Sequence, residues 1–298
     1  MVGSALAASL AAAGRRITRL VRSQSQMKTG DIYWKPEAKQ LDFAALEGID
    51  AVVHLAGETI SDRWTDQKKL RIVQSRLQST RLLAESLGRL KQPPKVLVSA
   101  SAIGYYGDRG SEVLLEQSPA GSGFLPELCH LWEAAAALSA EHGVRVVRLR
   151  IGIVLSDTGG ALAKMLPPFR MGFAGILGSG KQYMSWITLE DLVGVILHAI
   201  DSPDLHGPVN AVAPAPVTNE EFTRAVAEAL WGSPAPPVFT IPGFVVRLAF
   251  GEMGKELLLA STRVEPGKLK NSGYVFLYPE LEAALQHLVG RASLTKTR

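Results

Sequence analysis

The sequence predicts an α/β fold in which a doubly wound parallel sheet is followed by a small C-terminal domain. Short apolar runs typical of buried strands alternate with longer segments whose apolar residues recur every three or four positions, as in helices. Residues rich in Gly, Ser, Ala or Arg follow the strand-like runs, at the sheet edge where ligands bind in such folds. With 298 residues and 47% hydrophobic content, the chain can bury a full core.

The opening of the chain has the pattern of a nucleotide-binding helix and the strand after it. Residues 3–13 form a small apolar helix, Gly14 ends it, and residues 17–21 form a strand that leads into Arg22. A helix that starts at Gly3 would hold a pyrophosphate with its first backbone N–H groups. The strand and the glycines that precede such a helix in a complete unit do not occur in the sequence.

The rest of the N-terminal part continues the alternation. Strands are predicted at residues 31–34, 51–55, 95–99, 144–150 and 208–213. Helices are predicted at residues 41–46, 65–90, 124–142, 161–169, 189–200 and 218–230. The apolar face of the 65–90 helix comprises Leu70, Val73, Leu77, Ala84 and Leu87. Thr218 and Glu221 have the spacing of a capping box, and residues 172–180 form a Gly-rich loop.

Two domains are predicted, at residues 1–215 and 235–290. A Pro-rich segment at 233–237 has the composition of a linker between them. The second domain contains helical segments at residues 244–250, 256–260 and 279–288.

Composition excludes several classes of protein. The formal net charge is +4, but Lys and Arg are spread along the chain without the clustered basic face that nucleic acid requires. Cys129 is the single cysteine, which excludes an internal disulfide and fits a cytoplasmic location. No apolar run is long enough to span a membrane, and Arg15 and Arg16 follow the first apolar segment, whereas a signal peptide has its charges before it. The six histidines are scattered, so no metal site is expected.

Four segments, in this order, resemble the extended short-chain dehydrogenase/reductase superfamily with its Rossmann-like fold: VVHLAGE (52–58), VSASAIGYYGD (98–108), VVRLRIGIVLS (146–156) and WITLEDL (186–192). Further features resemble its branch of epimerase family proteins, which carry a small C-terminal domain of unknown function on the substrate side: Arg63-Trp64, Ser75-Arg76, LWEAAA (131–136) and STRVEPGKLKNSGYVFLYPELEAAL (261–285).

The resemblance implies a nicotinamide cofactor, NADPH rather than NADH. Arg22 supports this preference, because a guanidinium at the end of the second strand can pair with the 2′-phosphate of NADP. The alternative is that Arg22 is a solvated surface charge.

Further cofactor residues follow from the same resemblance. Leu55 and Ala56 would pack on the adenosine side, Arg76 would reach the cofactor from the long helix, and Val154 would lie near the nicotinamide. For Leu55, Ala56 and Val154, plain core packing is an equal alternative.

The catalytic residues that the resemblance implies are incomplete. Active members use a Ser that polarises the substrate carbonyl and a Tyr–Lys pair that moves the proton. Ser101 stands near the expected serine position, with Gly104 as a one-residue insertion, but Leu125 and Cys129 occupy the Tyr and Lys positions, and neither can do that work. Tyr105 and Tyr106 are substitute candidates; the alternative is that both pack locally.

Two functions therefore remain open. The first is an NADP-dependent oxidoreductase or nucleotide-sugar epimerase-like enzyme that acts on an unknown small molecule. The second is an NADP(H)-binding protein with little or no catalysis, in a sensing or assembly role. By analogy with the superfamily, a homodimer would form through the helices at 65–90 and 124–142.

The missing strand bears on both functions. We expect the sequence as written to be a shortened form that starts at an internal Met, because the absent strand would lie between the strands at 17–21 and 96–99. Buried backbone groups left unpaired there would cost about 1–3 kcal/mol each. An in-frame strand and Gly-rich turn encoded directly upstream is the expected finding, and a stop codon adjacent to Met1 would contradict it. If the short form is real, weak or no cofactor binding is expected.

Overall fold

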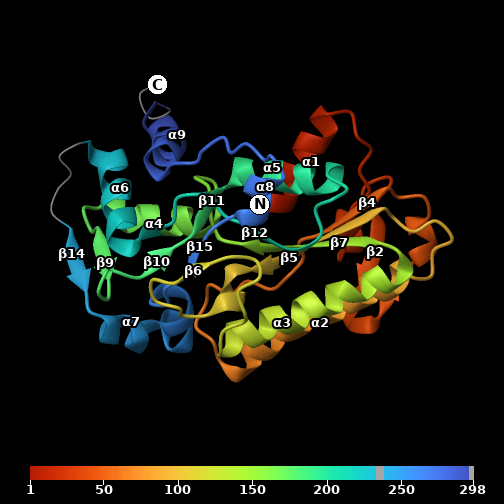
Figure 1. Ribbon diagram of the computed structural model, residues 1–298, viewed down its shortest axis with the longest axis horizontal. Coiled ribbons are helices and arrows are strands. Elements are labelled where there is room, and N and C mark those ends of the chain that lie inside the picture. The colour runs from red at the N-terminus through yellow and green to blue at the C-terminus, as the bar shows by residue number, and fades with distance from the viewer. Residues whose placement is uncertain (233–237, 295–298) are drawn as a thin grey trace.

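A four-stranded parallel sheet forms the centre of the protein (Figure 1). The computed structural model describes residues 1–232 and 238–294. The strands of this sheet lie in the order β12 (Gly207–Ala211), β7 (Arg145–Ile151), β5 (Val96–Ala102) and β4 (Ala51–His54). The neighbouring strands all pair in parallel. β5 is buried along nearly its whole length, as expected for a central strand covered on both faces.

Helices cover both faces of this sheet (Figure 1). One face carries α1 (Val2–Ala12), α5 (Leu189–Asp201) and α8 (Gly267–Asn271), and the other carries α2 (Asp66–Leu87) and α3 (Phe124–Ala137). Alternate strand residues point into the two apolar layers, because successive side chains of a strand face opposite sides. The predicted doubly wound α/β fold is therefore confirmed.

A second, smaller sheet follows α1. Its strands lie in the order β1 (Leu20–Val21), β2 (Ile32–Lys35) and β3 (Gln40–Leu41), and β1 pairs with β2 in parallel. Within residues 1–232 and 238–294, no strand pairs with the other edge of β1 or with the outer edge of β4. The sequence analysis placed the strand at 96–99 next to the expected additional strand. That prediction is wrong, because β5, which contains these residues, pairs with β4 on one side and with β7 on the other.

The chain beyond β7 builds the remaining part of the molecule. Its strands are β8 (Ile153–Leu155), β9 (Gly175–Leu177), β10 (Tyr183–Met184), β11 (Trp186–Thr188), β13 (Val217–Thr218), β14 (Phe239–Ile241) and β15 (Arg263–Val264). Its helices, besides α5 and α8, are α4 (Gly160–Arg170), α6 (Asn219–Trp231), α7 (Gly243–Phe250) and α9 (Leu281–Leu294). β15 pairs with β6 (Val113–Leu114), which precedes α3, so the C-terminal part is tied to the central domain.

Several local predictions can be compared with these elements. The capping box of α6 is confirmed, since the Thr218 hydroxyl accepts from the Glu221 N–H and the Glu221 carboxylate accepts from the Thr218 N–H. The Gly-rich loop at 172–180 contains the short strand β9, which pairs with β14. The predicted linker at 233–237 lies outside the described residues.

The buried face of α2 differs from the predicted apolar stripe. Leu70 is 54% exposed, whereas Ile72 and Leu83 are buried. The buried side also includes polar residues such as Thr80, whose hydroxyl accepts from the indole N–H of Trp132 at 3.0 Å. The prediction for Leu70 was wrong because apolar spacing alone does not register polar side chains that find partners inside the core.

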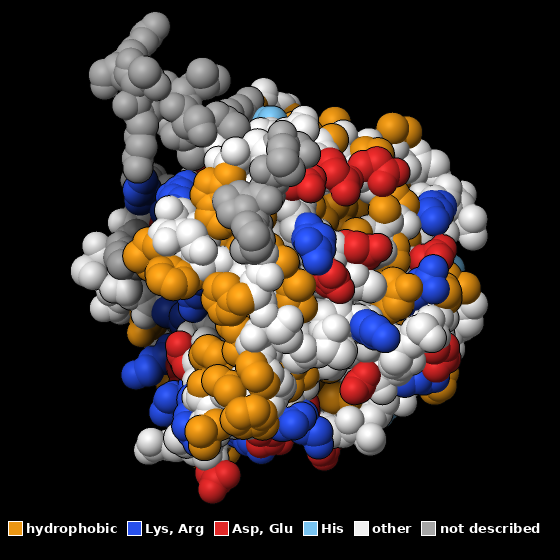
Figure 2. Space-filling model, turned by 90° about the vertical axis from the view of Figure 1, so that its left-hand side faces the viewer, with side chains coloured by type: hydrophobic (Ala, Val, Ile, Leu, Met, Phe, Trp, Pro, Cys, Tyr) orange, Lys and Arg blue, Asp and Glu red, His pale blue; other side chains and the backbone are white. Residues whose placement is uncertain are grey.

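Large apolar side chains gather on the face that carries α7 and β14 (Figure 2). Phe173, Phe239, Phe244 and Leu248 are each more than one-third exposed there, while Val246 is the large side chain of α7 that is buried. Exposed patches of this kind are typical of contact surfaces.

The C-terminal part caps the helix that follows β5. α3 has no side-chain cap of its own, because Gly123 occupies the N-cap position. Instead, the carboxylate of Glu256 accepts from the N–H groups of Phe124 at 3.1 Å and Leu125 at 2.9 Å. A negative charge at the N-terminus of α3 also interacts favourably with the positive end of the helix dipole.

We predict that Glu256→Ala lowers the free energy of unfolding by about 1–2 kcal/mol, because the first N–H groups of α3 lose their acceptor. Urea unfolding monitored by circular dichroism would measure the change. Glu228→Ala, an exposed acidic residue of α6, is the control and should change the free energy by less than about 0.5 kcal/mol. Equal effects of both substitutions would refute the capping role.

His54 generates a prediction about pH. It is buried at the end of β4, with its Nε2 atom 3.1 Å from both the Ser79 and Thr80 hydroxyls, and burial lowers its pKa to about 4. Because the unfolded pKa is near 6.5, the unfolded chain binds the extra proton first, and stability falls as the pH drops from 6.5 toward 4. When the pH is lowered from 7 to 5, the free energy of unfolding of His54→Asn should therefore fall by about 2 kcal/mol less than that of the wild type.

Urea titrations of both proteins at the two pH values test this, since carboxylates common to both cancel in the comparison. Parallel losses of stability in the two proteins would show that His54 does not titrate in this range.

Candidate functional site

The predicted site residues lie largely at one edge of the central sheet. Because the strands are parallel, the residues after β4, the end of β5 and the residues after β7 share the carboxyl edge. Ala56, Ser101 and Val154, far apart in sequence, are therefore brought to the same rim. Arg22 follows β1, which is not paired with this sheet; its side chain is exposed and makes no hydrogen bond or ion pair with the described residues.

The start of α1 faces this rim. Val2 and Ala5 belong to the same apolar cluster as Leu55 and Val154. The first turn of α1 has no capping side chain, so its N–H groups are free to bind an anion. Gly3 is exposed in this turn, and a Cβ added there would meet no atom within 4 Å. These features fit a dinucleotide phosphate beside an apolar surface.

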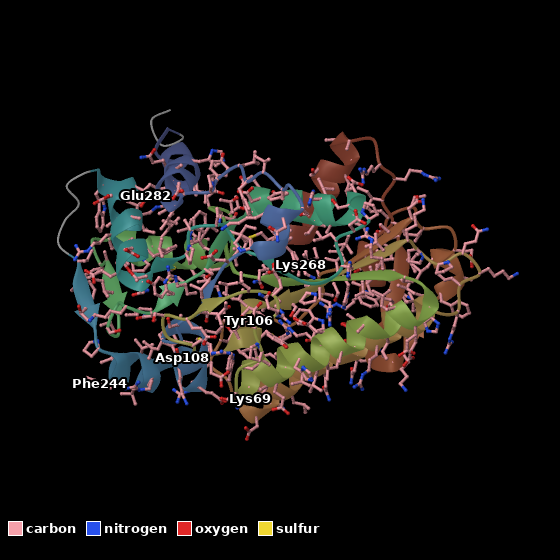
Figure 3. All side chains as sticks on the ribbon, viewed as in Figure 1. Lys69, Tyr106, Asp108, Phe244, Lys268 and Glu282 are labelled. Carbon is pink, nitrogen blue, oxygen red and sulfur yellow. The ribbon has the colours of Figure 1, made fainter. Side chains whose placement is uncertain are left out.

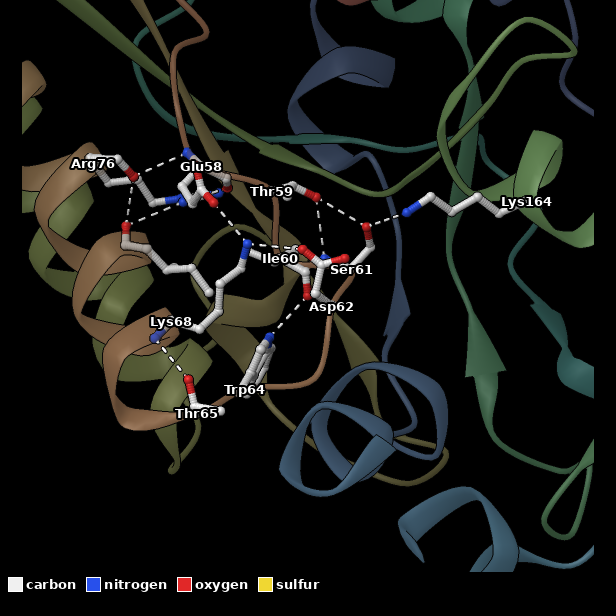
Figure 4. A network of polar contacts seen from close by, with 12 residues as sticks. Glu58, Thr59, Ile60, Ser61, Asp62, Trp64, Thr65, Lys68, Arg76 and Lys164 are labelled. Atoms are coloured by element: carbon white, nitrogen blue, oxygen red, sulfur yellow. Dashed lines mark hydrogen bonds and ion pairs between the residues drawn. The ribbon is translucent and has the colours of Figure 1, made fainter. Parts of the chain in front are cut away.

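Arg76 of α2 supports the loop after β4 (Figure 4). Its guanidinium donates to the carbonyl oxygens of Glu58 at 3.1 Å and Ile72 at 3.3 Å, and it lies 4.9 Å from the centre of the Trp132 ring. Burial lowers the pKa of Arg76. A Cβ at Gly57 would lie 3.1 Å from the guanidinium carbon, so a larger residue would crowd it. The structure thus uses Arg76 to position this loop.

The same loop carries a cluster of charges (Figure 4). The ammonium of Lys68 lies 2.7 Å from the Glu58 carboxylate and 2.9 Å from that of Asp62. The hydrogen bond from Lys68 lowers the pKa of both carboxyl groups. Lys164 of α4 donates to the Ser61 hydroxyl at 2.6 Å, so the loop is also joined to the C-terminal half.

Ser101 is committed to a buried ion pair. Its hydroxyl donates to the Glu133 carboxylate at 2.8 Å, and Arg150 donates to both oxygens of the same carboxylate at 2.8 and 3.0 Å. All three side chains are nearly inaccessible to solvent. Burial alone would lower the pKa of Arg150, but the hydrogen bonds and charge of Glu133 outweigh it and raise the pKa.

Tyr106 belongs to the same network and lies in the interior near the centre of the molecule (Figure 3). Its hydroxyl donates to the Asn210 side-chain oxygen at 2.6 Å and accepts from Arg150 at 2.9 Å. Burial raises the pKa of Tyr106 to about 12. A phenol that is buried and bonded in this way holds its proton at neutral pH.

Tyr105 is placed differently. Its side chain is half-buried, and the guanidinium carbon of Arg150 lies 3.5 Å from the centre of its ring. Its hydroxyl makes no hydrogen bond to another described residue. Of the two adjacent tyrosines, Tyr105 is the one whose hydroxyl is not used by the core.

The helix positions opposite Ser101 hold no acid or base. Leu125 is 4% and Cys129 is 2% exposed on α3, and Leu125 packs against Gly104. Burial raises the pKa of Cys129 to about 12, so the thiol stays neutral. Residues 1–232 and 238–294 also contain no group of His, Cys, Asp and Glu side chains suited to a metal ion.

Sequence reasoning missed Glu133, Arg150 and Asn210. A signal for the first two was present, because Glu133 stands within an apolar helix segment and Arg150 within an apolar strand, and buried charges must be paired. None of the helices in the described part of the chain has the length and hydropathy needed to cross a bilayer.

Comparisons with known proteins agree with this arrangement. Residues 1–212 match the NAD dependent epimerase/dehydratase family, and residues 241–288 match a domain of unknown function, DUF1731. An epimerase family protein of Mycobacterium tuberculosis is 41% identical over 292 residues, which cover 98% of this chain and 95% of the relative.

Solved structures are similar over the same length. The crystal structure of the human epimerase family protein SDR39U1 with NADPH is 35% identical, with a TM-score of 0.88, and the match covers 97% of this chain and 96% of that one. A nucleoside-diphosphate sugar epimerase of Corynebacterium glutamicum is 34% identical with a TM-score of 0.80, and the match covers 99% of this chain and 58% of that one. The family resemblance expected from the sequence is confirmed: the chain belongs to the NAD dependent epimerase/dehydratase family, among its epimerase family proteins.

Proposed function

We propose that this chain is an NADP(H)-binding protein that lacks the acid–base catalysis of its superfamily and acts in sensing or assembly. The observation that carries the proposal is the buried Glu133–Arg150 pair, which is hydrogen-bonded to the hydroxyls of both Ser101 and Tyr106. Ser101 donates to Glu133, and Tyr106 accepts from Arg150. A general acid or base must be free to meet a substrate proton, and these two groups are bonded inside the core.

The cofactor part of the proposal rests on the rim of the sheet. The first turn of α1 would hold the pyrophosphate, Leu55 and Ala56 the adenosine, and Val154 the nicotinamide end, which supplies hydride chemistry when bound. Arg22 would select the 2′-phosphate of NADP. The human relative crystallised with NADPH supports the same choice.

A second function is favoured by one observation. The Tyr105 hydroxyl is not used by the core, so it could transfer a proton at the nicotinamide end in an NADP-dependent oxidoreductase or epimerase acting on a small molecule. A homodimer through α2 and α3 and a cytoplasmic location stay predictions from the sequence.

Cofactor selection is tested at Arg22. We predict that Arg22→Glu weakens NADPH binding at least tenfold and leaves NADH binding within about twofold, because a charge-assisted hydrogen bond contributes about 1.5–3 kcal/mol. Isothermal titration measures both affinities. Arg16→Glu, an exposed arginine nearby in sequence, is the matched control. Equal losses for NADPH and NADH would remove Arg22 from phosphate recognition.

Turnover separates the two functions. The binding-protein function predicts no oxidation, reduction or epimerisation above background when the protein is assayed with NADPH or NADP and a substrate panel. The enzymatic function predicts turnover that Tyr105→Phe abolishes and Ser101→Ala retains. Turnover that persists in Tyr105→Phe would exclude the proton-transfer role.

Tyr106→Phe should lower the free energy of unfolding by about 1–3 kcal/mol under either function, because the buried partners of its hydroxyl lose their hydrogen bond.

A further inference from the structure

Arg263 is a partly buried cation that has no counter-ion among the described residues. Its Nε atom is shielded from solvent and has no hydrogen-bond partner, which is true of no other positively charged side-chain atom in residues 1–232 and 238–294. The guanidinium carbon lies 4.8 Å from the centre of the Tyr183 ring. Within that part of the chain, no carboxylate lies within 4.0 Å of Arg263. Unsatisfied buried polar groups are rare in proteins and are often explained by a ligand or ion.

The backbone around Arg263 is held from two sides. The hydroxyl of Thr262 donates to the Gly107 carbonyl at 3.3 Å. On the other side, the Ser185 hydroxyl donates to the Thr262 carbonyl at 2.8 Å and accepts from the Val264 N–H at 2.9 Å. The Arg263 side chain therefore starts from a fixed position and does not depend on a mobile loop.

Both of these anchors adjoin the candidate site. Gly107 follows directly after Tyr106, at the end of the turn that carries Tyr105. The carbonyl of Ser185 accepts from the Ile153 N–H at 2.9 Å, next to Val154. Arg263 thus stands on a strand between the tyrosine turn and the segment expected at the nicotinamide end of the cofactor.

Nearby acidic groups are already in use. The Asp108 carboxylate accepts from the N–H groups of Ser261 and Gly110, and that of Glu265 pairs with Lys270. The two terminal nitrogens of Arg263 make no hydrogen bond to the described residues and reach solvent. Two such nitrogens form the fork that binds a carboxylate or a phosphate in bidentate fashion.

From these contacts, we propose that Arg263, backed by the ring of Tyr183, binds an oxyanion of the small molecule that this protein recognises beside its cofactor. The ligand class is a phosphorylated or carboxylated small molecule. The proposal rests on the proposed function, since it places the group beside the nicotinamide end. The Tyr183 ring, whose centre lies 4.8 Å from the guanidinium carbon, stabilises the cation through a cation–π contact.

Thermal shift measurements on the full chain test this with inorganic pyrophosphate and acetate as probes, at constant ionic strength set by sodium chloride and with NADPH present at saturation. We expect one of the two anions to raise the melting temperature of the wild type, which identifies phosphate or carboxylate as the ligand. Arg263→Gln should weaken the binding of that anion at least tenfold and leave the affinity for NADPH unchanged. Arg224→Gln, an exposed arginine of α6, is the control and should bind as the wild type does.

Arg263→Lys keeps the charge but loses the paired donors of the guanidinium, and it should also weaken the binding of the anion. This substitution serves as the second variant if Arg263→Gln does not fold. An anion effect that is the same in the wild type and both variants, or absent from the wild type, would overturn the proposal. If NADPH itself does not bind, the anion titration is made without it: an effect that depends on Arg263 then supports the oxyanion site while the proposed function fails.

Discussion

A buried carboxylate and a buried guanidinium hold the carboxyl edge of the sheet together. Transferring Glu133 and Arg150 from water into the core has a large desolvation cost, which is offset only when both ions are fully bonded. Arg150 makes four hydrogen bonds, to the two oxygens of Glu133, to Tyr106 and to the Glu116 carbonyl. Removing one member would leave an uncompensated buried charge, at a cost of about 3–5 kcal/mol.

This requirement reaches into the C-terminal part of the molecule. Tyr106 passes the network to Asn210 of β12, whose backbone N–H donates to the Glu116 carboxylate. The same Glu116 oxygen accepts from the Lys268 N–H in α8. The central sheet and the segment after β15 are therefore joined by polar groups that cannot rearrange separately. This network holds the buried residues at the carboxyl edge of the sheet in place.

The chemical consequence is a division of labour at the rim. Groups that could act on a proton, Ser101 and Tyr106, contribute to the stability of the fold, whereas Tyr105 and the loop held by Arg76 stay partly exposed at the rim. The proposed function therefore separates cofactor binding at the rim from acid–base catalysis. The positions expected to be catalytic can serve packing while the fold is kept, which is why fold similarity alone does not establish a reaction.

The sequence by itself determined the alternation of strands and helices, the parallel sheet and the meeting of Ala56, Ser101 and Val154 at one edge, because apolar periodicity and the direction of parallel strands are local properties. It misplaced the buried face of α2 at Leu70, and it put the 96–99 strand where the central sheet has its edge, which is formed by β4. Only the tertiary structure decided how the polar side chains are used. Glu133, Arg150 and Ser101 are far apart along the chain, and their pairing depends on which elements the fold brings within hydrogen-bonding distance, a relation that no local pattern encodes.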